Sequence, residues 1–200
     1  MKRNPRILLF HKPKAVVVSR SDEHDRKTVY DMLPRWAWKE GWIPVGRLDR
    51  GTRGLLLFVR EQELVETLSR PGNLLKTYEV WIRGRVTLNH LQTISSGVAS
   101  PVGMLRCIRA NVVKMLGPKT QLQVTLDEGK NRHIRRMFGA LRDPLHRTPL
   151  KVLDLKRVQF GTISLDIPSG QWRFLSEKET DELLREDRGP QEPTPVPILE

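Results

Sequence analysis

The most apolar segment of the chain is LLLFV (residues 55–59), which follows the polar loop GRLDRGTRG (residues 46–54). Five bulky apolar residues in a row, bounded by glycine, are typical of a strand that is buried on both faces. Gly46, Gly51 and Gly54 allow the loop to bend, or to approach another group closely, where a Cβ would clash. The pattern therefore predicts a central buried strand that is entered from a polar, glycine-rich loop.

Other segments alternate apolar and polar residues with the period of two that is typical of β-strands. The expected strands cover residues 7–10, 15–19, 76–84, 104–115 and 120–127, a closing hairpin at 149–168 and a last strand at 172–176. In the third of these strands, Tyr78, Val80 and Ile82 share one face. Because strands outnumber helices and come in antiparallel runs, the expected fold class is α+β.

A period near 3.6 residues predicts the helices. They are expected at residues 27–33, 61–69 and 87–96, in a segment that follows Gly129, and from residue 177 to about 187. Thr87 is the expected N-cap of the third helix, with Leu88, Leu91 and Ile94 on its apolar face. The sequence SEKE (176–179) predicts a capping box at the start of the last helix.

The helix after Gly129 has two different faces. Its apolar side chains are Ile134, Met137, Phe138 and Leu141, and four arginines, Arg132, Arg135, Arg136 and Arg142, fall on the opposite side. A solvated basic face is the plain interpretation. The charge of the whole chain favours a contact with phosphates or with a catalytic group.

That charge is strongly positive. The 200 residues carry a formal net charge of +12. From Ser176 onward there are three basic and eight acidic residues, so residues 1–175 carry +17. Each phosphate that lysine or arginine neutralises releases counterions, which favours a nucleic acid as partner. An anionic membrane is disfavoured, because no basic amphipathic helix with a strong apolar face stands out at either terminus.

Residues 1–187 are expected to form one domain of two lobes, and the Pro-rich residues 188–200 a disordered tail. No run of about 18 apolar residues is present, which argues against a membrane span. The single Cys107 excludes an internal disulfide and a cysteine-built metal site. Without a recognisable export signal, a cytoplasmic protein is expected.

Two groups of side chains are candidates for chemistry or binding. Asp49 is the carboxylate of the polar loop and is flanked by arginines at 47, 50 and 53. For an aspartate in an arbitrary turn, the plain interpretation is a charged turn that keeps the protein soluble. The alternative for Asp49 is a catalytic carboxylate. For Trp36, Trp38 and Trp42, packing in the core or at its rim is favoured over stacking on a nucleic-acid base.

Four blocks of sequence resemble the RsuA-type pseudouridine synthases, which isomerise uridines in bacterial ribosomal RNA. They are LLFHKP (8–13), GRLDRGTRGLLLF (46–58), KTYEVWIRG (76–84) and EGKNRHIRRMF (128–138), in the order of that family. The closing residues 152–176 are also similar to the family's C-terminal strands, so the resemblance covers about residues 6–180. It implies the pseudouridine synthase fold, a mixed and mainly antiparallel sheet with flanking helices and an active-site cleft across its middle.

The resemblance also implies roles for individual residues. Asp49 is the catalytic carboxylate, Tyr78 stacks against the target base, and Arg135 is the cation that pairs with Asp49. RNA contacts are expected from Lys12, Arg47, Arg50, Lys130, Arg132 and Arg136. No cofactor or metal is expected, because the isomerisation needs no redox step and the sequence has neither metal-ligand spacing nor a P-loop.

The chain departs from the family at two positions. His133 stands where glutamine is usual and His11 where asparagine is usual, so RNA contacts there are expected to differ. Family members often begin with a small RNA-binding S4 domain. Here the catalytic domain begins at about Arg6, and we expect that domain to be absent, as in the shorter members that modify large-subunit RNA. A monomer is expected.

The expected function is the isomerisation of specific uridines to pseudouridine in ribosomal RNA, with large-subunit RNA as the expected substrate. The reaction breaks the N1–C1′ bond, rotates the uracil and rejoins it through C5, so the base must first leave its stack. Two alternatives are a non-catalytic ribosomal-RNA-binding or assembly protein on the same fold, and a glycoside or nucleoside hydrolase. A hydrolase normally needs two carboxylates, and the central loop offers only Asp49.

Overall fold

Strand β3 (Arg53–Val59) contains the apolar run and lies inside the sheet. In the computed structural model, which describes residues 6–186, the side chains of residues 55–59 have no exposed surface. Leu56 and Phe58 belong to one core cluster, whereas Leu55 and Leu57 belong to a second cluster. Because successive side chains of a strand point to opposite faces, β3 is buried on both sides, as predicted.

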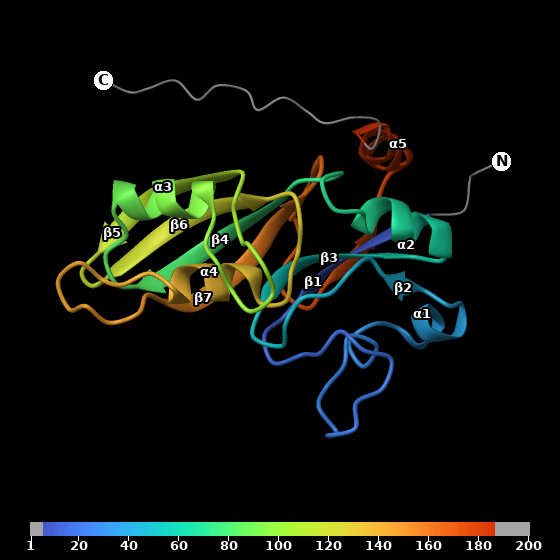
Figure 1. Cartoon of the computed structure of the whole chain (residues 1–200). Helices are drawn as coiled ribbons and strands as arrows, with labels where there is room; N and C mark the ends of the chain where they lie inside the picture. Colours follow the sequence, from blue (N-terminus) through green and yellow to red (C-terminus); the bar gives the residue numbers. More distant parts are fainter. Residues whose placement is uncertain (1–5, 187–200) are drawn as a thin grey trace.

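The described residues form a nine-stranded sheet in the order β5-β6-β4-β7-β3-β1-β9, with β2 paired to β3 and β8 paired to β7 outside this path (Figure 1). Neighbouring strands are antiparallel, apart from a short parallel contact between β3 and β7. The expected α+β class with a mainly antiparallel sheet is therefore confirmed. The remaining strands are β1 (Ile7–Lys12), β2 (Ile43–Pro44), β4 (Lys76–Arg83), β5 (Arg109–Leu116), β6 (Lys119–Leu126), β7 (Lys151–Phe160), β8 (Ile163–Ser164) and β9 (Trp172–Phe174).

Five helices of the described chain flank this sheet. They are α1 (Arg35–Lys39), α2 (Gln62–Ser69), α3 (Leu88–Ser96), α4 (His133–Gly139) and α5 (Glu177–Glu186). Helices α3 and α4 cover the half of the sheet formed by β4 to β7, and α2 and α5 lie over β1 and β3 (Figure 1). None of the described helices is long and apolar enough to cross a membrane.

The two predicted helix caps are confirmed. The Thr87 hydroxyl accepts a hydrogen bond from the His90 amide, and Ser176 and Glu179 form the capping box of α5. The predicted apolar face of α3 is only partly correct. Ile94 is fully buried, but Leu88 is 78% exposed, because the first turn of the helix extends beyond the core cluster.

Two predicted elements are absent from the structure. Residues 15–19 and 27–33 form turns, joined by an isolated bridge between Val17 and Thr28, instead of a strand and a helix. The Asp31 carboxylate accepts hydrogen bonds from the amide and the hydroxyl of Thr28. Such side-chain bonds to the backbone compete with helix formation, and the periodic pattern does not reveal them. The predicted tail, residues 188–200, lies outside the described residues.

The parallel contact between β3 and β7 depends on Gly54. This residue has φ +115°, and a Cβ there would lie 2.6 Å from the Arg157 backbone nitrogen and still nearer to its carbonyl oxygen. The buried Arg157 guanidinium also donates from Nε to the Leu55 carbonyl at 2.7 Å. The two halves of the sheet therefore meet at a backbone approach that only glycine allows.

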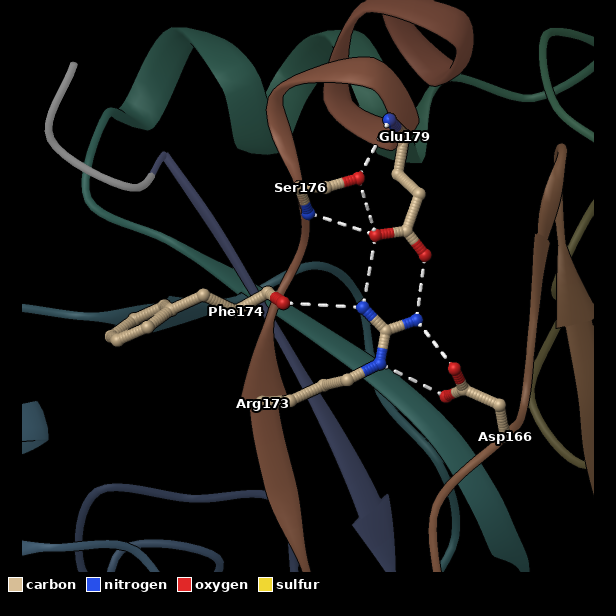
Figure 2. Close-up of polar contacts among 5 residues, drawn as sticks. All are labelled: Asp166, Arg173, Phe174, Ser176 and Glu179. Carbon is tan, nitrogen blue, oxygen red and sulfur yellow. Dashed lines mark hydrogen bonds and ion pairs between the residues drawn. The ribbon is translucent and has the colours of Figure 1, made fainter. Parts of the chain in front are cut away.

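Strand β9 and helix α5 are joined by one arginine, Arg173 (Figure 2). Its guanidinium makes ion pairs with Asp166, at 2.8 Å, and with Glu179, at 2.6 Å. Glu179 also accepts hydrogen bonds from the amide and the hydroxyl of Ser176. The bond to Arg173, with those from Ser176, lowers the pKa of the Glu179 carboxyl to about 2.

The first prediction concerns Gly54. Gly54→Ala should lower the free energy of unfolding by about 3 kcal/mol, because the added Cβ meets the Arg157 backbone at an unfavourable φ. Gly139→Ala is the matched control, since a Cβ at Gly139 meets no atom within 4 Å. The control should be as stable as the wild type or up to about 1 kcal/mol more stable. Urea unfolding measures both values, and equal stability of the two variants would contradict this role of Gly54.

The second prediction concerns acid stability. The pKa of Glu179 is lower in the folded chain than in the unfolded chain, so its contribution is present above the ordinary carboxyl pKa and is lost as the pH falls toward about 2. Glu179→Gln should therefore lose less stability than the wild type between pH 5 and about pH 3. Glu177→Gln, which removes an exposed carboxylate with no partner among residues 6–186, is the control. An unchanged acid profile in Glu179→Gln, measured by urea unfolding, would refute the prediction.

Candidate active site

The loop that carries Asp49, residues 46–52, is held in place at several points. The Thr52 amide donates to the Asp49 carbonyl at 2.9 Å and closes a turn. The Ala15 amide donates to the Arg50 carbonyl at 2.9 Å, which ties the loop to the chain that follows β1. We call this segment the Asp49 loop. It presents the Asp49 carboxylate with 30% of its side-chain surface exposed.

A cavity of about 350 Å³ opens beside Asp49. Its wall is formed by the Asp49 loop, by strand β4 and by the residues that lead into α4. The lining residues are Arg47, Leu48, Asp49, Thr52, Tyr78, Leu126, Gly129, Lys130, Asn131, Arg132, His133, Ile134 and Leu155. Tyr78 is only 8% exposed and belongs to the core cluster, so its ring is held by packing. The structure therefore brings Asp49 and Tyr78 to the same cavity, although they lie on different elements.

The cation that forms an ion pair with Asp49 is Arg132. Its Nη1 lies 4.0 Å from the Asp49 Oδ2, and the Arg132 side chain is 54% exposed. Arg132 is the N-cap of α4 and has φ +52°, a left-handed conformation that is uncommon for arginine. This backbone conformation accompanies the turn from the preceding loop into α4, and the Arg132 side chain reaches the cavity there.

Arg135, to which the resemblance assigned the pairing with Asp49, has other partners in the structure. Its Nη2 donates to the Gly51 carbonyl at 3.0 Å and its Nη1 to the Val152 carbonyl at 3.3 Å. Burial, together with the nearby charge of Arg132, lowers the pKa of the Arg135 guanidinium. Arg135 therefore bridges the Asp49 loop, α4 and strand β7, while the ion pair of Asp49 is made by Arg132.

Lys12 does not lie on the surface, where an RNA contact was expected. Its side chain has no exposed surface, and its Nζ donates to the Pro13 carbonyl at 3.0 Å and to the Val16 carbonyl at 2.7 Å. Burial lowers the pKa of Lys12 to about 8, and the charge of Asp49 opposes this shift. The ammonium group supports the turn beside the Asp49 loop, and we remove Lys12 from the expected RNA contacts.

Of the five other basic residues expected to contact RNA, three line the cavity. Arg47, Lys130 and Arg132 line it, and Arg50 is exposed on the Asp49 loop. Lys130 donates to the Met104 carbonyl at 2.8 Å and forms an ion pair with Glu128. Arg136, also on this side of α4, donates to the Asn131 side chain at 3.0 Å. Three of these cations therefore share the cavity with Asp49, while Arg50 lies on the Asp49 loop and Arg136 on α4.

Thr52 and His133 also line the cavity; Thr52 was not predicted as a site residue, whereas for His133 a changed RNA contact was expected. The hydroxyl of Thr52 is buried without a partner among residues 6–186. His133 donates from Nε2 to the Arg106 carbonyl at 3.0 Å, and burial lowers the pKa of its imidazole. The i to i+3 spacing of Asp49 and Thr52 is the sequence signal that could have placed Thr52 in the same turn. For His133 the signal was its place in the block EGKNRHIRRMF, which also contains Arg132.

Three of the residues around Asp49 thus have distinct positions. Tyr78 is buried and lines the same cavity, Arg132 is half-exposed and forms the ion pair, and Arg135 is bonded to the Gly51 carbonyl of the loop. Within residues 6–186, no group of three or more His, Cys, Asp and Glu side chains is placed to hold a metal ion. The arrangement offers one carboxylate, a flat aromatic ring and several cations around a cavity open to solvent.

The sequence and the fold are similar to those of known proteins. The family model described as RNA pseudouridylate synthase matches residues 6–140. The ribosomal large subunit pseudouridine synthase B of Vibrio cholerae is 34% identical over 181 residues, which cover 89% of this chain and 54% of that protein. The protein of the same name from Haemophilus influenzae is 34% identical over 184 residues, which cover 90% and 49%. The chain thus spans about half the length of these curated relatives.

A solved structure described as a pseudouridylate synthase has a TM-score of 0.74 with this chain, at 24% identity. The match covers 90% of this chain and 74% of the solved one, and it confirms the expected fold. The family match includes the Asp49 loop, Tyr78 and helix α4, which together surround the cavity. On this evidence the chain belongs to the RNA pseudouridylate synthase family.

Proposed function

We propose that this chain isomerises uridine to pseudouridine in RNA, with Asp49 as the catalytic carboxylate. The observation that carries the proposal is the position of Asp49 beside Tyr78, at a cavity that the family match includes. The reaction is an isomerisation, so the atoms of the substrate are conserved and no second reactant is required. The cavity offers the side chains that this isomerisation needs, namely one carboxylate, an aromatic ring and several cations.

The proposed mechanism starts with a uridine that leaves its stack and enters the cavity. Its uracil contacts the Tyr78 ring, and the ribose lies beside Asp49. The carboxylate either attacks C1′ or removes the 2′ proton, and the N1–C1′ bond breaks. The uracil then rotates and C5 bonds to C1′, which releases the carboxylate from C1′ or is followed by return of the proton to C2′. The hydrogen on C5 leaves as a proton, and N1 takes up a proton. Both routes require one carboxylate next to the sugar.

We infer that the substrate is ribosomal RNA of the large subunit, modified in the cytoplasm. The relatives from Vibrio cholerae and Haemophilus influenzae are named for that subunit. The net charge of +17 on residues 1–175 supports a polyanionic substrate. The cations at the cavity mouth supply contacts to phosphates on either side of the flipped base.

Two other functions were considered from the sequence. A hydrolase of the usual two-carboxylate type is disfavoured, because Asp49 is the one carboxylate among the described residues that line the cavity. The nearby Asp154 is already paired with Arg53, at 2.7 Å, and with Lys14, at 2.6 Å. A non-catalytic RNA-binding protein would not require a carboxylate that faces the bound phosphates. The position of Asp49 therefore disfavours this second alternative.

The third prediction tests the role of Asp49. Asp49→Asn keeps the shape of the side chain but removes the nucleophile or base, so isomerisation should fall below detection while RNA binding remains. The assay is tritium release from ribosomal RNA labelled at uridine C5, where the new bond displaces hydrogen. Asp181→Asn, an exposed change on α5, is the matched control and should keep the wild-type rate. Release of tritium by Asp49→Asn at the wild-type rate would refute the proposal.

The fourth prediction separates the two arginines. Arg135→Ala removes two hydrogen bonds from a charged donor and should lower the free energy of unfolding by about 2 kcal/mol. Arg132→Ala removes an exposed ion pair and should change stability by less than about 1 kcal/mol. It should instead weaken RNA binding and flatten its salt dependence. Urea unfolding and RNA titrations at two salt concentrations measure these effects, and equal destabilisation by the two changes would contradict the assignment.

A further inference from the structure

A second cavity, of about 290 Å³, lies between α1 and the turns that follow β1. It is lined by Arg20, Thr28, Tyr30, Asp31, Arg35, Trp38 and Lys39, none of which lines the cavity at Asp49. Its volume is close to the lower end of the range for ligand pockets, about 300 Å³. Within the described chain it is a separate site, and the proposed mechanism does not use it.

The central side chain of this cavity is Trp38. Its surface is 49% exposed, whereas Trp42, four residues further on, is 1% exposed and Trp36 packs on Trp172 with ring centroids 5.2 Å apart. Tyr30 meets the Trp38 ring edge to face, with centroids 5.1 Å apart, and donates from its hydroxyl to the Trp42 carbonyl at 2.6 Å. The Trp38 ring is therefore held in position by a fixed neighbour while half of its surface faces solvent.

The charged groups around Trp38 are mainly basic. Arg20 lies over the ring at 5.4 Å from its centroid, and Arg35 and Lys39 line the same cavity. None of these three cations forms an ion pair among residues 6–186. The one acidic residue among those that line this cavity is Asp31, whose Oδ2 is bound by Thr28, at 2.7 Å from the amide and 2.9 Å from the hydroxyl. The cavity thus combines an exposed aromatic face with a net positive charge.

We propose that this cavity binds a nucleotide of single-stranded RNA. Its base stacks on Trp38, and the flanking phosphates contact Arg20, Arg35 and Lys39. Aromatic rings bind bases of any identity by stacking, and basic side chains bind the phosphates beside them. The second oxygen of Asp31 accepts a hydrogen bond from an exocyclic amino group, which favours adenine, guanine and cytosine over uracil.

The position of the cavity connects it to the proposed reaction, and the proposal rests on RNA as the substrate. The turns that carry Arg20 and Tyr30 begin where the Ala15 amide is bonded to the Arg50 carbonyl of the Asp49 loop. A strand of RNA whose uridine occupies the first cavity can therefore continue along these turns toward Trp38. The second cavity then acts as a contact for RNA outside the target uridine, and it adds to affinity and to the choice of site.

A peptide is the other class of ligand to consider. An acidic peptide would satisfy the cations, but the acidic side chains that do so carry no aromatic plane to stack on the exposed Trp38 ring. A nucleotide satisfies both features at once, because its base is planar and its phosphates are anionic. RNA is therefore the favoured occupant.

The test uses an RNA that contains no uridine, so that it cannot be a substrate at Asp49. The probe is a fluorescein-labelled single-stranded RNA of six adenine–cytosine repeats, titrated with the whole chain and followed by anisotropy. Trp38→Ala should weaken binding about tenfold, the loss expected when one base no longer stacks, and Trp38→Phe should retain most of the affinity. Arg35→Ala should weaken binding and lower the slope of log affinity against log salt by about one. Lys178→Ala is the control. This lysine lies on α5 with 85% of its side chain exposed, and its replacement should leave binding unchanged.

Photochemical crosslinking locates the contact independently of the variants. Irradiation of the wild-type complex should attach the oligonucleotide to a peptide that contains Trp38. Binding by Trp38→Ala equal to that of the wild type, or crosslinks only at the residues around Asp49, would overturn the proposal. A wild-type chain that binds this RNA through Trp38 but releases no tritium from labelled ribosomal RNA would refute the proposed reaction and leave the second site in place.

Discussion

The close approach of Gly54 to Arg157 is the constraint on which the rest of the site depends. Strand β3 is buried on both faces, and it joins β7 through this one parallel contact. The approach fixes where the Asp49 loop leaves the core, because Thr52, the last residue of the loop, directly precedes β3. Arg135 then fastens the same loop to β7 and α4, through the carbonyls of Gly51 and Val152. The carboxylate is thus held by backbone contacts, and its position does not depend on a flexible ion pair.

The cations near Asp49 divide into structural and accessible groups. Lys12 and Arg135 are directed at backbone carbonyls and stabilise the loop. Arg132, with 54% of its side chain exposed, is free to contact a phosphate as well as the carboxylate. Basic residues that look equivalent in the sequence therefore have different roles, because burial decides which of them can reach a nucleic acid.

The sequence predicted β3, β4, α2 and the caps of α3 and α5, since their periodicity and capping residues are local signals. It failed at residues 15–33, where Asp31 and Thr28 form side-chain bonds that replace a helix. It also could not show that Lys12 is buried or that the ion pair of Asp49 is made by Arg132, because those facts depend on contacts between distant segments. Trp38 shows the same limit: the sequence favoured packing over base stacking for Trp36, Trp38 and Trp42 alike, and only its 49% exposure distinguishes Trp38 from Trp42.

The central claim is that Asp49 makes this chain a pseudouridine synthase acting on ribosomal RNA. The most direct test is to map pseudouridines in ribosomal RNA from cells that lack the gene and from the same cells supplied with wild-type or Asp49→Asn protein. The account predicts that at least one pseudouridine of the large-subunit RNA disappears with the gene, returns with the wild type and stays absent with Asp49→Asn. Retention of every pseudouridine without the gene, or restoration by Asp49→Asn, would contradict it.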